Sequence, residues 1–219
     1  MTIEIFWGSG SPYAWRAMLA LEAKKIPYVS RLLEFSKEEH KAPGFLALNP
    51  RGKVPTLKDG DFVLSESLAI MAYLDRKYPD PPLFGRTPEE TGQVWKAISE
   101  SVSYLEPPGY RIVIPIFFGT AEDNLDDIRA AVPEVHEELG LMERRLDAES
   151  WLALGRLSAA DLAVYPFVEV LLRAAGKESA QPLGLGLLPF AERYPAIEKW
   201  RERIRTMPGY DNTYPPHWR

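Results

Sequence analysis

The chain has 219 residues, a net charge of −5 and no cysteine. A chain of this length forms one large domain or two small ones, and 46 % hydrophobic with 26 % charged residues is an ordinary globular composition. The acidic balance argues against a general binder of nucleic acid or anionic membranes, which needs a basic face. The lack of cysteine excludes disulfides, thiolate metal sites and a cysteine nucleophile.

The amino-terminal residues lack the features of a secretion signal. Met1–Phe6 has neither a basic start nor a long apolar stretch. The longest apolar segment near the middle, Ile112–Phe118, contains Pro115 and is far too short to cross a bilayer. We therefore expect a cytoplasmic protein without a membrane or nucleic-acid partner.

The first part of the chain predicts alternating strands and helices. Ser11 followed by Pro12 is a typical N-cap and first helical residue, and Ile3 and Ile5 alternate with Glu4 as in a strand. The expected order is β-α-β-α-β-β-α. Its elements are a strand at 3–5, a helix from 11 to about 24, a strand at 29–33, a short irregular helix at about 38–48, a hairpin at 54–64 with an Asp-Gly turn at 59–60, and a helix opened by 66–67.

A proline cluster at 79–88 cannot continue a helix and predicts a boundary. We assign residues 1–79 to an α/β domain, 80–87 to a linker and 88–219 to an all-helical domain. Thr87-Pro88-Glu89-Glu90 and Ser158-Ala159-Ala160-Asp161 are capping sequences that open helices. Further helices are expected at about 125–146 and 196–206, and the prolines after Tyr104 should break or bend the helix that starts near Thr87.

Four short segments of the α/β domain carry groups suited to ligand binding. They lie at 9–13, 40–41, 53–55 and 66–67. The first and last open helices, whose free N–H groups and positive dipole ends attract anions such as a thiolate, carboxylate or phosphate. A cis bond before Pro55 would leave the backbone of Val54 free to pair with a peptide ligand, whereas a trans loop proline is the ordinary alternative.

The run EHKAPGFLALNPRGKVPTL at 39–57, followed by DGDFVLSESLAI at 59–70, resembles the glutathione-binding domain of the cytosolic glutathione transferases, most closely the serine-type classes (phi, tau, theta and zeta). Ser158–Asp161 and Tyr194-Pro195, with Trp200 and Pro208, resemble the helical domain of the same family. The resemblance covers almost the whole chain. It implies a thioredoxin-like first domain, an all-helical second domain, a homodimer, and glutathione as co-substrate without a metal.

The resemblance also implies a set of glutathione contacts. They are the backbone of Val54 beside a cis Pro55 for the cysteinyl part, Glu66 and Ser67 for the γ-glutamyl end, and His40, Lys41 and Lys53 near the glycyl carboxylate. The family often has glutamine at the position of Lys53, and a lysine there offers charge on a flexible stem.

Ser11 matches the catalytic serine of the family. A hydroxyl that donates a hydrogen bond to sulfur, together with a helix N-terminus, favours the thiolate, so this serine stabilises the nucleophile without being one. Two alternatives stay open: Ser11 as an N-cap only, and Ser9 as the hydroxyl at the sulfur.

The second substrate of such an enzyme is a small hydrophobic electrophile. The resemblance implies that Tyr13, Tyr104 and Arg111 face it, and we interpret Ile114, Phe117 and Phe118 as ordinary core. Ser158 and Asp161 are assigned to helix capping. We expect His136 and His217 to be solvated or satisfied by neighbours, because three scattered histidines without cysteine make no metal site.

The predicted function is conjugation of glutathione to hydrophobic electrophiles, with reduction of organic peroxides as a side activity. Two alternatives remain: a zeta-like isomerase or dehalogenase that depends on glutathione, and a non-catalytic binding protein of the same fold. The absence of cysteine excludes the branches that form a mixed disulfide with the protein.

Overall fold

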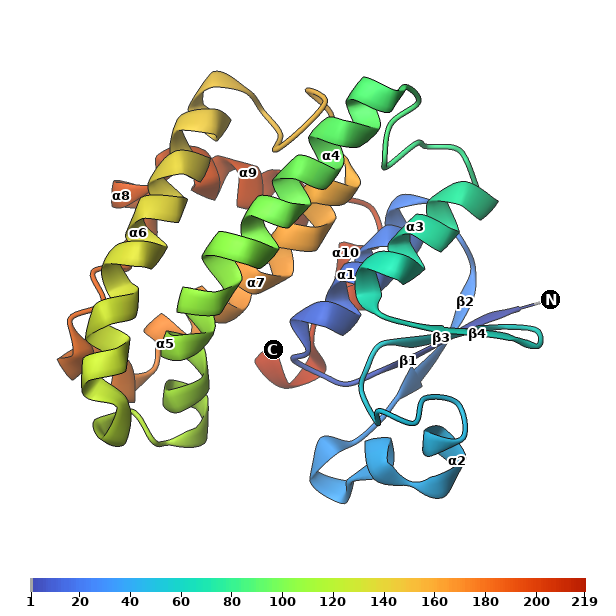
Figure 1. Ribbon diagram of the computed structural model, residues 1–219, viewed down its shortest axis with the longest axis horizontal. Coiled ribbons are helices and arrows are strands. Elements are labelled where there is room, and N and C mark those ends of the chain that lie inside the picture. Colours follow the sequence, from blue (N-terminus) through green and yellow to red (C-terminus); the bar gives the residue numbers. More distant parts are fainter. Residues whose placement is uncertain (1) are drawn as a thin grey trace. The chain divides into compact units, whose positions relative to one another are not determined.

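The computed structural model describes residues 2–219, which divide into two compact units (Figure 1). The first unit extends to Phe84 and also includes the C-terminal segment Arg205–Arg219. The second unit is Gly85–Ile204. The chain therefore leaves the first unit, builds the second and returns to the first.

The first unit is built on a mixed four-stranded sheet. Its strands are β1 (Ile3–Trp7), β2 (Tyr28–Leu32), β3 (Thr56–Asp59) and β4 (Phe62–Ser65), in the order β2-β1-β3-β4. β1 and β2 run parallel, and the other neighbours are antiparallel. The parallel pair needs a crossover, which α1 (Pro12–Ala23) supplies. The thioredoxin-like α/β order expected from the sequence is thus confirmed.

The core of this unit lies between the sheet and two helices. Helix α1 contacts α3 (Ser67–Lys77), and both bury one apolar side against the strands. Alternation along β1 turns Ile3 and Ile5 to the same face. The fully or almost fully buried core members include Ile3, Ile5, Ala17, Met18, Leu21, Leu57, Ile70 and Leu74.

Two local predictions in this unit need correction. The predicted Asp59-Gly60 turn is wrong by one residue: Asp59 still pairs with Phe62 as the last residue of β3, and the loop is Gly60-Asp61. As a strand residue, Asp59 turns its carboxylate to α3, where it accepts a hydrogen bond from Tyr73 Oη (2.7 Å) and pairs with Lys77. The short, irregular helix expected at 38–48 is divided into one 3₁₀ turn (Glu39–Lys41) and the four-residue helix α2 (Pro43–Leu46).

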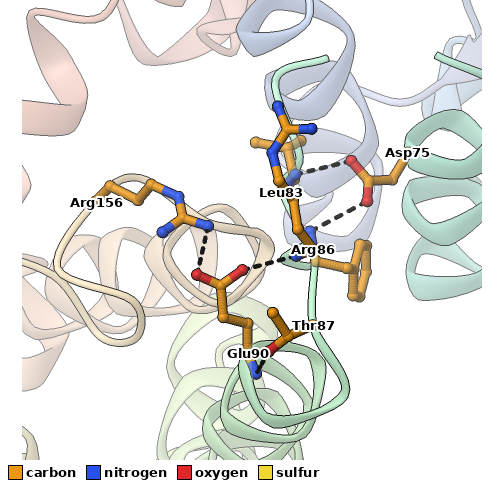
Figure 2. Close-up of polar contacts among 7 residues, drawn as sticks. Asp75, Leu83, Arg86, Thr87, Glu90 and Arg156 are labelled. Carbon is orange, nitrogen blue, oxygen red and sulfur yellow. Dashed lines mark hydrogen bonds and ion pairs between the residues drawn. The ribbon is translucent and has the colours of Figure 1, made fainter. Parts of the chain in front are cut away.

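A buried lysine organises the proline-rich segment that closes the first unit. Lys24 lies at the end of α1, pairs with Asp75 (2.7 Å) and donates to the carbonyl oxygens of Tyr78 and Pro81. The carboxylate of Asp75 also accepts from the backbone N–H of Leu83 at 2.8 Å (Figure 2). A buried cation with this many oxygen partners has its desolvation compensated.

The second unit is helical. Its helices are α4 (Pro88–Glu100), α5 (Glu106–Phe118), α6 (Leu125–Ala148), α7 (Ala159–Ala175), α8 (Phe190–Arg193) and most of α9 (Pro195–Arg205). The all-helical architecture expected for this part of the chain is confirmed. No helix among the described residues is both long enough and apolar enough to cross a membrane.

The prolines after Tyr104 bend the hydrogen-bond pattern without ending the helical run. Between α4 and α5 the residues Ser101–Leu105 form a π-helical turn, in which the Glu106 N–H reaches back to the carbonyl of Ser101. Pro107 and Pro108 have no N–H to donate to the preceding turn, and a π turn accommodates such a change in register.

The start of α4 differs slightly from a standard capping box. Thr87 Oγ1 accepts from the Glu90 N–H (3.2 Å), as expected. The Glu90 carboxylate reaches one residue further, to the Arg86 N–H (2.7 Å), and also binds Arg156 at 3.0 Å (Figure 2). These hydrogen bonds lower the pKa of Glu90.

The predicted structural role of Asp161 is confirmed. Its carboxylate is completely buried and accepts from the Ser158 N–H and hydroxyl. The bond from the Ser158 N–H is one half of the capping box of α7, in which the Ser158 side chain in turn accepts from the Asp161 N–H. It also accepts from the Leu152 N–H and from Trp200 Nε1, both at 2.9 Å. One carboxylate thus connects α7, the preceding loop and α9.

His136 is satisfied by neighbours, as expected. Its two ring nitrogens lie 2.6 Å from Tyr194 Oη and 2.8 Å from the carbonyl of Leu185. Burial lowers the pKa of this imidazole, so the neutral ring is favoured at this position.

We predict that Asp161→Ala destabilises the protein by about 3–5 kcal/mol, because buried donors on Leu152, Ser158 and Trp200 lose their acceptor. Urea denaturation followed by circular dichroism measures the change. The matched control is Asp126→Ala on α6, whose carboxylate is exposed and pairs only with Arg129; it should leave the midpoint unchanged. Equal midpoints for both variants would contradict the role given to Asp161.

Candidate active site

The strand register brings three chain segments to one edge of the sheet. Thr56, the first residue of β3, pairs with Phe6 near the end of β1 and with Ser65 at the end of β4. The residues after β1, before β3 and after β4 are therefore neighbours. These are Gly8–Ser11, Val54-Pro55 and Glu66-Ser67, three of the four segments that the sequence singled out.

Two helices begin at this edge. α1 starts at Pro12 with Ser11 as N-cap, and α3 starts at Ser67. Each presents free N–H groups and a positive dipole end close to the end of a strand. Such an arrangement suits an anion.

The two candidate serines differ in their partners. Ser11 Oγ accepts a hydrogen bond from the Ala14 N–H (3.2 Å), which leaves its hydroxyl proton to be donated elsewhere. Ser9 Oγ lies 2.5 Å from His217 Nδ1. Ser11 therefore does act as an N-cap, but as an acceptor, so its hydroxyl can still donate a hydrogen bond to a ligand.

The Val54–Pro55 bond is cis, as the resemblance implied. β3 begins only at Thr56, so Val54 precedes the strand ladder. A buried side chain that the sequence analysis did not single out supports this segment: Asn49 donates to the Lys53 carbonyl (2.8 Å) and to Thr56 Oγ1 (3.2 Å) and accepts from the Arg51 N–H. The Asn-Pro dipeptide at 49–50 was a turn signal that could have drawn attention to it.

The segment of His40 and Lys41 lies beside the residues that precede Val54. Gly52 has a φ of +58°, and a Cβ there would lie only 2.9 Å from the His40 carbonyl oxygen and 3.1 Å from Lys41 Nζ. The Lys41 ammonium group therefore sits next to Gly52, one residue from Lys53, and both lysines are exposed. Exposed positive charges on neighbouring segments attract an anionic ligand such as a carboxylate.

His40 is held by an aromatic contact. Its ring packs edge-on against Phe35 with centroids 5.1 Å apart, and within the described chain its buried Nδ1 has no hydrogen-bond partner. Phe35 in turn packs directly on Gly8, where a Cβ would lie 2.1 Å from its ring. This contact ties the segment of His40 to the loop after β1.

Glu66 has an unusual backbone. Its φ is +70°, outside the range that residues with a side chain prefer, while the carboxylate is exposed and the next residue, Ser67, is buried. A left-handed conformation of this kind costs about 1–3 kcal/mol and is often kept where it aims a group at a ligand.

The three residues expected at an electrophile site belong to different units. Tyr13 is on α1 of the first unit, 38 % exposed, with the Arg16 guanidinium 5.0 Å from its ring centroid. In the second unit, Tyr104 lines an open cavity of about 440 Å³. Arg111 is paired with Asp127 and Glu134, each at 2.7 Å, and hydrogen bonds to these carboxylates raise the pKa of its guanidinium.

The assignment of three apolar residues of α5 to the core was wrong. Ile114, Phe117 and Phe118 are 49 %, 37 % and 78 % exposed. They lie on the outer side of α5, whose inner side is formed by Ile112, Val113 and Ile116. The Lys177 ammonium covers one edge of this patch, 5.4 Å from the Phe117 ring centroid.

Within residues 2–219, no cluster of three or more histidine or acidic side chains is arranged to hold a metal ion.

Comparison with protein-family models matches residues 10–77 to the glutathione S-transferase N-terminal domain and residues 105–208 to the glutathione S-transferase C-terminal domain. Glutathione S-transferase A of Pleuronectes platessa is 30 % identical over 221 residues, 99 % of this chain and 92 % of the relative. Glutathione S-transferase F10 of Arabidopsis thaliana is 34 % identical over 74 % of this chain and 78 % of its own.

Among solved structures, the crystal structure of a glutathione S-transferase from the Antarctic clam Laternula elliptica has a TM-score of 0.80 and 32 % identity, and covers 100 % of this chain and 94 % of that one. A thioredoxin-like unit followed by a helical unit is the two-domain architecture of the glutathione S-transferases. The chain belongs to the glutathione S-transferase family of enzymes, as its resemblance to that family implied.

We predict that Asn49→Ala lowers the free energy of unfolding by about 1–3 kcal/mol, because a buried side chain loses its hydrogen bonds to Arg51, Lys53 and Thr56. Thermal and urea unfolding measure the loss, and hydrogen exchange should show faster opening of residues 50–54. Asn124→Ala is the matched control, since that amide makes one exposed contact to the Thr120 carbonyl. An unchanged unfolding midpoint for Asn49→Ala would count against this support.

Proposed function

We propose that the chain binds glutathione at the sheet edge formed by residues 8–11, 54–55 and 66–67, and that the Ser11 hydroxyl stabilises its thiolate for attack on small hydrophobic electrophiles. One observation carries this proposal: the register places the Ser11 N-cap, the cis Val54–Pro55 bond and the start of α3 together. A scaffold without ligand chemistry has no need of all three at one edge.

The chemistry follows from the pKa of a thiol. A free thiol titrates near about 8.5, so only a few per cent is thiolate at neutral pH. A hydrogen bond from Ser11 and the positive end of α1 favour the charged form. The thiol proton leaves to solvent, the sulfur then forms a bond to the electrophilic carbon, and the leaving group departs with the electron pair of the broken bond.

The same edge offers groups for both ends of the tripeptide. The backbone of Val54 can pair with the cysteinyl residue like an added strand, and Glu66 and Ser67 hold the γ-glutamyl end. His40, Lys41 and Lys53 attract the glycyl carboxylate. The position of the Lys41 ammonium group beside Gly52 supports this assignment, because Lys53 is the next residue along the chain.

We assign Tyr13, Tyr104 and Arg111 to the electrophile site. The exposed ring of Tyr13 follows Ser11 by two residues, and Tyr104 is also exposed. The carboxylates already paired with Arg111 reduce its net attraction for an anion, which fits an apolar second substrate. Peroxides are a further class of acceptor: the thiolate attacks a peroxide oxygen, an alcohol leaves, and a second glutathione thiol displaces water from the resulting sulfenic acid to give the disulfide.

We predict that Ser11→Ala lowers kcat/KM for glutathione and a generic aryl halide by about tenfold to a hundredfold, the worth of one charge-assisted hydrogen bond. Steady-state assays measure it, and Ser11→Thr, which keeps a hydroxyl, should retain more activity. Ser179→Ala, at an exposed position of the second unit, is the control that should match the wild type.

Other outcomes of these assays separate the alternatives. Loss in Ser9→Ala with full activity in Ser11→Ala would assign the thiolate contact to the other serine. Glutathione that is recovered unchanged after turnover would indicate an isomerase or dehalogenase. Wild-type protein that binds glutathione without turnover of any electrophile would indicate a binding protein.

We also expect a homodimer in the cytoplasm, as is usual in the family, with residues 64–74 and the helix after Thr87 as candidate surfaces. Light scattering coupled to size exclusion should give twice the mass of the chain at micromolar concentration. A monomer mass at that concentration would contradict this expectation.

A further inference from the structure

The C-terminal segment of the chain covers the loop that carries Ser11. His217 Nδ1 lies 2.5 Å from Ser9 Oγ. The same imidazole lies across Gly10, where a Cβ would be 2.8 Å from its Cε1 and 3.2 Å from its Nε2. A residue that is 208 positions away in sequence therefore touches both residues before Ser11.

This segment is fixed to the same helix turn that Ser11 caps. Trp15 lies in the first turn of α1, and its N–H donates to the carbonyl of Ser11. The indole Nε1 of Trp15 donates to Thr213 Oγ1 (2.8 Å), and its ring makes edge contacts with Tyr214 and Trp218, with centroids 5.8 and 5.5 Å apart. His217 is thus held at its position from both sides in sequence.

The loop itself is poorly suited to hold a fixed position. Gly8-Ser9-Gly10-Ser11 contains two glycines, and Gly10 has a φ of +84°. Glycine leaves the backbone with many accessible conformations. On the helix side the loop is fixed by the Ser11 N–H to the Gly8 carbonyl and by the cap bond to Ala14; His217 holds the other side.

We propose that His217 is a positioning residue for the thiolate-stabilising serine. It acts by holding the hydroxyl of Ser9 and covering Gly10, so that Ser11 keeps its hydroxyl directed at the sulfur. The inference rests on the proposed role of Ser11. It also gives Ser9 a function: its hydroxyl is the attachment point for the C-terminal segment.

The size of the effect follows from how sharply catalysis depends on position. A displacement of about 1 Å can cost about a hundredfold in rate. Removing the contact between Ser9 and His217 loosens the loop without deleting Ser11, so we expect a loss of about tenfold in rate. Because Ser9 and His217 act as one unit, removing either should cost about as much as removing both.

The test compares Ser9→Ala, His217→Ala, the double variant, His217→Asn and Ser11→Ala in the full chain with glutathione and an aryl halide. Two readouts are needed: kcat with KM for glutathione, and the pH titration of the bound thiol by the ultraviolet absorbance of its thiolate. The first three variants should lower kcat about tenfold at neutral pH and raise the pKa of the bound thiol by about one unit, with little change in KM.

The conservative variant separates position from charge. An asparagine amide can replace Nδ1 as partner of Ser9 but carries no charge, so His217→Asn should restore most of the activity. Arg219→Ala, which removes a hydrogen bond to the Asp211 carbonyl, is the matched control and should behave as the wild type. Ser9→Ala deletes a single oxygen and keeps the fold intact if His217→Ala proves unstable.

Four results would overturn the proposal. The bound thiol could titrate as in the wild type in Ser9→Ala and His217→Ala but be shifted in Ser11→Ala. This result would refute the positioning role of His217 and leave the proposed function standing. Additive losses in the double variant, or no recovery in His217→Asn, would also refute it. Wild-type behaviour of Ser11→Ala would refute the positioning role of His217 together with the assignment of Ser11 as the catalytic serine.

Discussion

The antiparallel pairing of β3 with both β1 and β4 determines where the candidate chemistry can take place. Because Thr56 faces Phe6 on one side and Ser65 on the other, the ends of these strands meet at one edge. Two helices start there, so their positive ends and the segment of Val54 lie at the same edge of the sheet. A slip of one residue would turn every side chain of β3 to the other face and separate these groups.

Residues outside the proposed glutathione contacts support the groups at this edge. Asn49 supports the segment before Pro55, Phe35 connects the His40 segment to Gly8, and Trp15 holds the C-terminal residues against α1. In the second unit, Asp161 performs a comparable task for α7 and α9. Catalytic geometry depends on such supporting contacts as much as on the groups that touch substrate.

Features that depend on residues close together in the sequence could be predicted. The strand and helix order, the caps at Ser11 and Ser158, and the cis Pro55 implied by the resemblance all agree with the structure. Contacts between segments far apart in the sequence could not be predicted. Nothing near Asn49 or His217 in sequence names their partners, and the apolar character of Phe118 predicted burial although the residue lies on an open side of its helix. The roles of the individual site residues remain predictions.

The first unit is discontinuous, because residues 205–219 return to it after the whole second unit has been made. On the ribosome, these residues emerge after the whole second unit. Domains tend to fold in the order in which they are synthesised, so the sheet and α1 can form early but lack the Trp15 and Ser9 contacts until residues 213–217 have been made. The loop that carries Ser11 is then completed only after the second unit has been made, and a chain that lacks residues 205–219 has a formed sheet edge without its full set of restraints.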